Sequence, residues 1–516
     1  MIKRTGKRYR TWMAGCAAVL AIVPIASACS FGAKDDANER RTLRIGMSYG
    51  SKNSEMYVRQ ELTDMFELSH KNIDIEYVNA IDYSDRQFTS EEEYKKLQQI
   101  DPYEKLKEIM TGDNPVDVVF TDLNQLHKLV QDNLIKPLDP MIKEDKMDLS
   151  DFLPAVLDTI REQGNGQLYG LSSTFSNSAL FYNKKLFAKA GINPPTDGMT
   201  WDEVFALARS MKSGTGKDAV YGFNTGSYGG GLNFYDLYYS YVEPLNLRMF
   251  DAAGEKMTVD TDLWKKAFGK PFDLYKDHVI PHPEDLQANQ PQNGRYNPYQ
   301  GRPFIQGQVA MEIGGYYQVN DLISYNKNVD KMKGAEKLDW DVVTLPTHPE
   351  AQNGGVGIGL GNLAVINAKA ANPKDAWALI KHLNSDEVAK FKARSMSDLS
   401  VRQTYLKPKE GETYRIEAFT NFKPGVYMQS DADEKLYRER PNLNLIMQVG
   451  QLYVTQAING KLTLDEALKS WQTKGNDLLQ KIKLNPTGDL NGEIQAIQEA
   501  TWGGSAEEKL WMAAGG

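Results

Sequence analysis

The chain has 516 residues, of which 41% are hydrophobic and 25% are charged, so it is long and apolar enough to bury a large core. Its formal net charge is −8, which makes the chain a poor candidate for nucleic-acid binding. We therefore expect no nucleic-acid partner, and two cysteines are too few for a disulfide framework.

Residues 1–29 have the pattern of an export signal. A basic stretch without acids precedes an apolar run at 11–29, which is too short and too interrupted to span a bilayer well. The run ends in Ala-Ser-Ala followed by Cys29, which resembles a bacterial lipoprotein box. The resemblance implies that the signal is cut before Cys29, whose lipid then holds the protein on the extracellular face of the cell membrane. The alternative is an ordinary secretory signal with a chance cysteine.

After the signal, residues 30–41 are small and charged without period, which predicts a flexible tether. From residue 42 onward, segments with strand patterning alternate with segments of helical spacing. The expected strands are 43–47, 73–78 and 116–120, and the expected helices are 54–69 and 92–111. The third strand is almost entirely apolar, as in a parallel sheet whose two faces are both covered by helices. This order indicates an α/β fold.

Polar and aromatic side chains follow the first and third of these strands. Tyr49 and Ser51 come after the first strand, and Asp122 and Asn124 come after the third. Ligands of open α/β sheets bind at the carboxyl ends of the strands, so we predict that these four residues lie at a ligand-binding edge. Asp122 is equally well explained as the N-cap of a helix at 123–132, and one residue can fill both roles.

The rest of the chain carries a series of short motifs. They are VDVVFTDLNQLHKLVQDNLIKPL at 116–138, LYGL at 168–171, ALFYNKKLFAKAGI at 179–192, TWDE at 200–203, FDAAG at 250–254 before an expected strand at 257–259, FIQGQVAM at 304–311, GGYY at 314–317, DVVTLP at 341–346 before an expected glycine-rich strand, and NPKDAW at 372–377. In order and spacing they resemble the extracellular solute-binding proteins of bacterial ABC importers, of the group that contains the maltose-binding and other carbohydrate-binding members.

This resemblance implies an α/β fold of the periplasmic-binding-protein type, with two hinged lobes and a ligand cleft between them. It implies that lobe one takes 42–180 and 345–395, that lobe two takes 183–340 and 396–516, and that the chain crosses near 180–182 and 342–345. The implied function is that of a lipid-anchored receptor, which captures a small polar solute outside the cell and delivers it to ABC importer permease subunits. An oligosaccharide is the expected solute. We expect a monomer that uses no cofactor and no metal.

Aromatic side chains beside polar ones are the mixture that a sugar needs. A flat ring stacks on the apolar face of the sugar, while polar groups bond to its hydroxyls. Further candidate ligand-binding residues with this character are Phe175, Tyr228, Tyr235, Asp236, Tyr316, Tyr317 and Gly357. Relatives often carry a sugar-stacking aromatic, commonly Trp, where Tyr316 and Tyr317 stand. For any single tyrosine, a place at the edge of the core is an equally good explanation.

Other motifs favour no chemistry on a substrate. The glycine repeat at 355–361 lacks the strand-then-helix setting of a dinucleotide loop. Pro281 lies between His278 and His282 and argues against a helix that would pair them on a metal. Two acids such as Asp122 and Glu312 could act together as in a glycosidase, so a secreted carbohydrate-active enzyme stays open as an alternative. A sugar-sensing receptor that does not transport is another.

Two later segments have a clear local pattern. The polar stretch 284–300 predicts a loop, and surface decoration is favoured there over a role in ligand binding. Strong helical spacing over 462–482 predicts a helix that closes lobe two.

Overall fold

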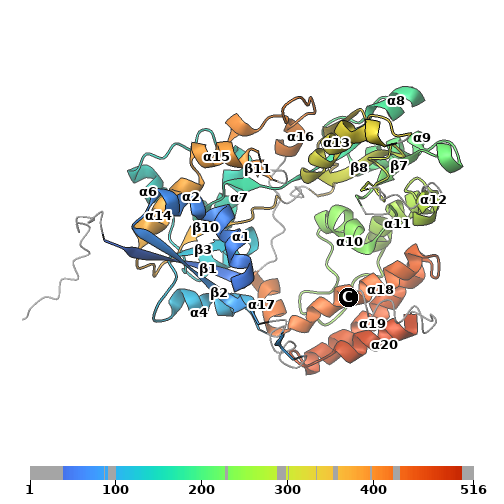
Figure 1. The fold of residues 1–516 in the computed structure, drawn as a ribbon. Helices are drawn as coiled ribbons and strands as arrows, with labels where there is room; N and C mark the ends of the chain where they lie inside the picture. Colours follow the sequence, from blue (N-terminus) through green and yellow to red (C-terminus); the bar gives the residue numbers. More distant parts are fainter. Residues whose placement is uncertain are drawn as a thin grey trace, which may run out of the picture.

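The computed structural model shows a two-lobed α/β protein (Figure 1). It describes residues 39–85, 88–90, 100–226, 230–287, 298–299, 301–332, 334–351, 358–394, 398–421 and 431–501. Cys29, Tyr228 and Gly357 lie outside these ranges, as does the expected glycine-rich stretch up to residue 357. None of the described helices is long and apolar enough to cross a membrane.

Lobe one is built around a five-stranded sheet in the order β2-β1-β3-β10-β4. The strands are β1 (Arg41–Gly50), β2 (Ile73–Asp82), β3 (Val118–Thr121), β4 (Gly170–Leu171) and β10 (Leu363–Ile366). The pairs β1–β2 and β1–β3 are parallel, whereas β10 runs antiparallel to β3 and β4. The carboxyl ends of β1, β2 and β3 therefore share one edge with the start of β10. The three strands expected from the sequence are confirmed, and β1 and β2 run several residues further.

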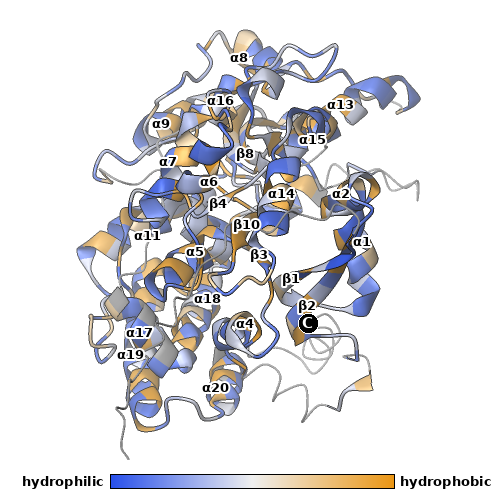
Figure 2. Cartoon of the chain, turned by 90° about the vertical axis from the view of Figure 1, so that its left-hand side faces the viewer, coloured by the Kyte–Doolittle hydropathy of each residue, from blue (hydrophilic) through white to orange (hydrophobic). Residues whose placement is uncertain are grey.

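Helices cover this sheet, and β3 and β10 are buried along their whole length. Figure 2 shows the contrast between the mostly hydrophilic α1 and the apolar β10. The helices are α1 (Lys52–Leu62), α2 (Asp64–Ser69), α4 (Pro102–Thr111), α5 (Leu123–Gln131), α6 (Asp139–Glu144), α7 (Pro154–Gln163), α14 (Pro373–Leu383) and α15 (Asp386–Lys392).

The structure divides the helix expected at 54–69 into α1 and α2. The break falls at Thr63, a fully buried residue whose hydroxyl forms a hydrogen bond of 3.0 Å with the hydroxyl of Tyr77 on β2. The last part of the helix expected at 92–111 is α4. It begins at Pro102, because Asp101 caps it and proline suits a first helical position. Residues 91–99 lie outside the described ranges.

Lobe two has a four-stranded sheet in the order β7-β8-β6-β9. Its strands are β6 (Ser178–Asn183), β7 (Tyr221–Asn224), β8 (Val309–Gly315) and β9 (Trp340–Val343). Strand β6 is antiparallel to β8 and β9, and β7 is parallel to β8. Just before β6, the short strand β5 (Thr174–Phe175) forms a two-stranded antiparallel sheet with β11 (Leu399–Ser400). The chain thus passes between the two sheets after β4 and returns between β9 and β10.

The helices of lobe two include most of the C-terminal part of the chain (Figure 1). They are α8 (Lys184–Ala190), α9 (Trp201–Met211), α10 (Phe234–Leu237), α11 (Asp262–Lys276), α12 (Pro283–Gln287), α13 (Tyr317–Asn328), α16 (Glu417–Thr420), α17 (Asp431–Glu439), α18 (Leu445–Ile458), α19 (Leu464–Leu484) and α20 (Asn491–Thr501). A short π-helical turn, Tyr238–Val242, continues α10. The helix expected at 462–482 is confirmed as α19.

Close packing between α18 and α19 depends on a glycine. A Cβ atom on Gly450 would lie 2.4 Å from the ring of Trp471, which is completely buried. The indole N–H of Trp471 donates a hydrogen bond of 2.9 Å to the carbonyl oxygen of Ile446 on α18. The two helices are therefore joined by a buried aromatic ring that needs a bare backbone opposite it.

The structure departs from three local expectations. The strand expected at 257–259 is only an isolated bridge between Phe250 and Met257. The loop expected at 284–300 begins as α12, and residues 288–297 lie outside the described ranges. Residues 398–406 were expected in lobe two, but the Leu153 N–H donates to the carbonyl oxygen of Val401, which holds this segment against lobe one.

Candidate functional site

Two tyrosine rings lie together at the carboxyl edge of the lobe-one sheet. Tyr49, near the end of β1, is 46% exposed and stacks on Tyr83, which follows β2. The ring centroids are 6.1 Å apart and the planes are 4° from parallel. Partial burial raises the pKa of the Tyr49 phenol, and the charges of Tyr83, Asp101 and Asp122 raise it further. The phenol is therefore neutral at physiological pH and can both donate and accept a hydrogen bond.

The polar residues at this edge also serve as helix caps. Ser51 forms a capping box with Ser54 at the start of α1. Asp122 Oδ1 accepts a hydrogen bond of 2.9 Å from the Gln125 N–H, which confirms the N-cap interpretation for α5. Asp122 and Asn124 are both exposed, and Asp122 Oδ2 accepts no hydrogen bond from any residue that the structure describes. One carboxylate oxygen thus stays available to a ligand.

A second pair of tyrosines lies on lobe two. Tyr235 of α10 and Tyr239 one turn later are both exposed, with ring centroids 6.2 Å apart and planes 12° from parallel. The Tyr235 hydroxyl donates to Gln451 Oε1 of α18 at 2.9 Å. Beside them, Asp236 accepts hydrogen bonds from the side chains of Asn233 and Thr225. This arrangement repeats the one on lobe one, with two stacked rings next to a carboxylate.

Tyr83 and Tyr239 are not among the ligand-binding residues predicted from the sequence. Tyr239 could have been found from its spacing, because residues four apart on a helix lie on the same face. Tyr83 could not, since its partner Tyr49 is brought to it by the pairing of β1 with β2.

The two neighbouring tyrosines at the end of β8 have opposite environments. Tyr317, the first residue of α13, is 54% exposed, and its ring lies over Gly315, where a Cβ would come within 2.7 Å of the ring. Tyr316 is only 4% exposed, and its hydroxyl lies 3.2 Å from that of Tyr414. Its ring packs edge-on against Phe419. The expectation that both rings face a ligand is therefore corrected, because Tyr316 is part of the core.

Phe175 is also placed in the core by the structure. It is 1% exposed and lies on β5, which pairs with β11. Its ring face is covered by protein, so stacking on a ligand would require a rearrangement that the structure does not show. It was selected from the sequence because it is an aromatic residue beside polar ones.

A buried carboxyl group lies below the end of the lobe-two sheet. Glu312 on β8 accepts hydrogen bonds from Asn224 Nδ2 at 2.6 Å and from Gln318 Nε2 at 2.7 Å. Burial raises the pKa of Glu312 to about 7, although both amides and the charge of Arg302 lower it. With both oxygens bonded to amides beneath the surface, Glu312 does not form an exposed catalytic pair with Asp122, which belongs to the other sheet.

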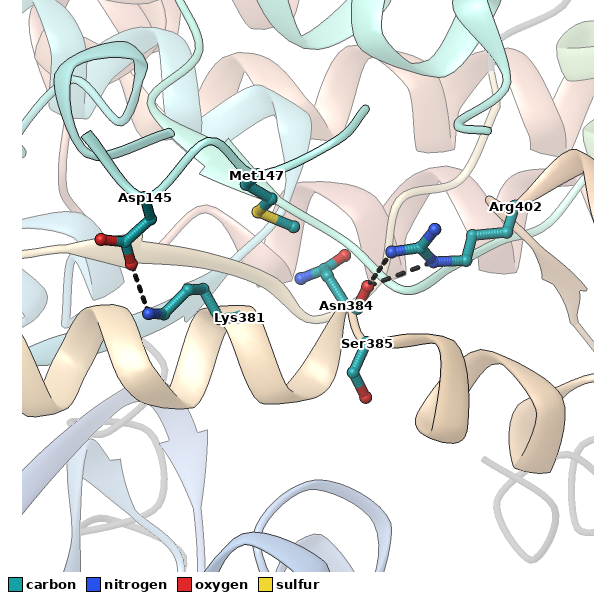
Figure 3. Close-up of a pocket in the computed structure, with 6 residues that line it drawn as sticks. All are labelled: Asp145, Met147, Lys381, Asn384, Ser385 and Arg402. Atoms are coloured by element: carbon teal, nitrogen blue, oxygen red, sulfur yellow. Dashed lines mark hydrogen bonds and ion pairs between the residues drawn. The ribbon is translucent and has the colours of Figure 1, made fainter. Parts of the chain in front are cut away.

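A cavity of about 450 Å³ opens at the end of α14 and contains none of the predicted ligand-binding residues (Figure 3). Its lining comprises Asp145, Met147, Lys381, Asn384, Ser385 and Arg402. Lys381 is paired with Asp145, and Arg402 donates two hydrogen bonds to the main-chain carbonyl of Asn384. These cations therefore stabilise the carboxyl end of α14. Among the described residues, no group of three or more His, Cys, Asp or Glu side chains could hold a metal ion.

Comparison with known proteins gives a consistent result. Residues 53–390 match the family described as bacterial extracellular solute-binding protein. The chain is 27% identical over 394 residues to a protein of Brucella abortus named only as a binding protein. The matched region covers 74% of this chain and 79% of that protein. It is 29% identical over 111 residues to the arabinooligosaccharide-binding protein of Bacillus subtilis, covering 21% of this chain and 24% of the relative.

The fold is shared with solved structures. The sugar-binding protein MalE of Xanthomonas citri superposes with a TM-score of 0.54 at 19% sequence identity, covering 86% of this chain and 98% of MalE. The matched family and these relatives are binding proteins rather than enzymes.

Proposed function

Because the chain belongs to the bacterial extracellular solute-binding protein family, we propose that it is the receptor of an ABC importer. It captures a small polar solute outside the cell and delivers it to permease subunits, without chemistry on the solute. The observation that carries this proposal is the repeated arrangement of two stacked tyrosines beside a carboxylate, once on each lobe, with both rings exposed on lobe two and Tyr49 exposed beside the half-buried Tyr83 on lobe one.

The ligand that this arrangement fits is an oligosaccharide. Successive sugar rings each present an apolar face to an aromatic ring and hydroxyls to carboxylates and amides. On lobe one the proposed contacts are Tyr49, Tyr83, Asp122 and Asn124, with Ser51 holding the helix start. On lobe two they are Tyr235, Asp236, Tyr239 and Tyr317. Tyr228 and Gly357 are the remaining proposed ligand-binding residues. The name of the Bacillus subtilis relative supports this ligand class.

Binding between two lobes gives a mechanism. A ligand that contacts both lobes stabilises a closed arrangement of the lobes, and the permease recognises this closed form. The division of the chain into 42–180 with 345–395 and 183–340 with 396–516, apart from the segment 398–406 that contacts lobe one, is part of this proposal, as is the monomeric state. The segments that join β4 to β6 and β9 to β10 are the places where the hinge would bend.

The membrane location is proposed from the first 41 residues. Acylation of Cys29 would hold the protein at the extracellular face of the cell membrane, and residues 30–41 would let the lobes reach the permease.

The test is a binding and turnover assay on the purified protein. Arabinotriose and maltotriose are screened by thermal shift, with arabinose and glucose as controls, and a sugar at 100 times its Kd stabilises the protein by about 2.7 kcal/mol. We expect stabilisation by a trisaccharide, compaction of the protein in small-angle scattering, and no change in the sugar by chromatography. Cleavage of the sugar would favour the carbohydrate-active enzyme, and a screen with no stabilising sugar would contradict the proposal. Normal binding without import by cells would favour a sensing receptor.

A further inference from the structure

One buried carboxyl connects the bases of two segments of the proposed lobe-two site. Glu312 is 7% exposed and accepts hydrogen bonds from Asn224 at the end of β7 and from Gln318 in α13. Asn224 is followed by Thr225, which donates to Asp236 of α10. Gln318 directly follows the exposed Tyr317. The positions of Asp236 and Tyr317 are thus tied to the same carboxyl group.

One polar atom in this cluster has no partner. Asn224 Oδ1 is buried and makes no hydrogen bond within the described part of the chain. A deprotonated Glu312 cannot correct this, because a carboxylate only accepts hydrogen bonds. A protonated Glu312 can supply Oδ1 with a donor, since its O–H would donate to Asn224 Oδ1 once the amide turns over, and Asn224 Nδ2 then takes the position that Oδ1 held. The cluster therefore has two hydrogen-bond arrangements, one for each protonation state of Glu312.

The surroundings of Glu312 are close to neutral. From β6 its register partner is the apolar Phe181. The charge that acts on it comes from Arg302, and that guanidinium is ion-paired with Asp321 of α13. On α10 the nearest acid in the network is Asp236, which Thr225 and Asn233 hold. Because no cation forms an ion pair with Glu312 among the described residues, burial dominates, and its pKa of about 7 lets both forms exist at physiological pH.

We infer that Glu312 is a positioning residue whose protonation arranges the lobe-two side of the binding site, so that ligand affinity depends on pH. This inference rests on the function proposed above. A ligand and a closing lobe remove further water from this end of the sheet, and lower polarity favours the neutral carboxyl. Binding therefore takes up a proton, and affinity falls as the pH rises from 6 to 8.

The variant Glu312→Gln tests this directly. A glutamine amide can donate to Asn224 Oδ1 as the protonated carboxyl does, but it does not titrate. The matched control is Asp398→Asn, because burial also raises the pKa of Asp398, which lies in lobe one with Glu61 and Lys392 as its charged neighbours. Arabinotriose and maltotriose are titrated separately at pH 6, 7 and 8, with binding followed by intrinsic fluorescence.

For the unmodified protein we expect Kd to rise about fivefold from pH 6 to pH 8 if binding raises the pKa of Glu312 by one unit. Asp398→Asn should keep this profile, and Glu312→Gln should bind equally at all three values. A flat profile for the unmodified protein, or an unchanged profile for Glu312→Gln, overturns the inference but leaves the receptor function intact. No binding of either sugar at any pH overturns the proposed function and this inference together.

A second measurement does not depend on any variant. Calorimetry of the unmodified protein at pH 7, in two buffers with different ionisation enthalpies, reports directly whether binding takes up protons. Uptake supports the inference, and the absence of uptake overturns it.

Discussion

Glu312 also makes a specific prediction about stability. Its pKa is about 7 in the folded protein and about 4.5 in an unfolded chain. Below pH 4.5 the carboxyl is protonated in both states, so burial carries no charge penalty. Between pH 4.5 and 7 the unfolded chain releases the proton and the folded protein keeps it, so the free energy of unfolding falls as the pH rises. The shift corresponds to a loss of about 3 kcal/mol by pH 8, at about 1.4 kcal/mol for each pKa unit.

The assay is equilibrium urea unfolding of the unmodified protein and of Glu312→Gln at pH 5, 6, 7 and 8. The difference between the two proteins cancels all other titrating groups, and we expect it to grow in favour of the variant by about 2–3 kcal/mol from pH 5 to pH 8, because part of the loss already occurs below pH 5. If the lobes unfold separately, the transition of lobe two is the one that should respond. A difference that stays constant with pH would refute the argument, because Glu312 would then have an ordinary pKa. A difference that grows in favour of the unmodified protein would mean that the folded protein lowers this pKa.

Three further predictions concern the site and the anchor. Asp122→Ala should weaken sugar binding by about 1.5–3 kcal/mol in calorimetry and also lower the apo melting point through the lost helix cap, whereas Asp122→Ser should keep the cap and lose only affinity. Tyr317→Ala should weaken the free energy of binding by about 1–3 kcal/mol with little change in the melting temperature of the ligand-free protein, whereas Tyr316→Ala should mainly lower that melting temperature. The reverse pattern would show that the ligand contact has been assigned to the wrong tyrosine. Cys29→Ser should move the protein from the membrane fraction to the soluble fraction without loss of binding, and a variant that stays in the membrane would rule out the lipid anchor.

Local patterns were sufficient to predict part of the secondary structure of each lobe. The first three strands, the cap at Asp122 and the helix α19 depend on periodicity and capping within a few residues, and all are present. The motif order also indicated the two-lobed family fold, which the matched family confirms. The prediction failed at Thr63, where the apolar spacing continues but a buried hydroxyl is bonded to Tyr77 of the next strand.

Which of the candidate side chains can reach a ligand was decided by the tertiary structure. Tyr316 and Tyr317 are adjacent and chemically identical, so no sequence pattern separates them. Tyr316 is buried because two residues about a hundred positions later in the chain contact it: Phe419 packs edge-on against its ring and the Tyr414 hydroxyl lies 3.2 Å from its hydroxyl. Tyr317 is instead 54% exposed. The same holds for Glu312, whose partner Asn224 is 88 residues away and is brought to it only by the pairing of β7 with β8. Periodicity and capping are properties of neighbouring residues, whereas burial and pKa depend on the segments that the fold packs around a side chain.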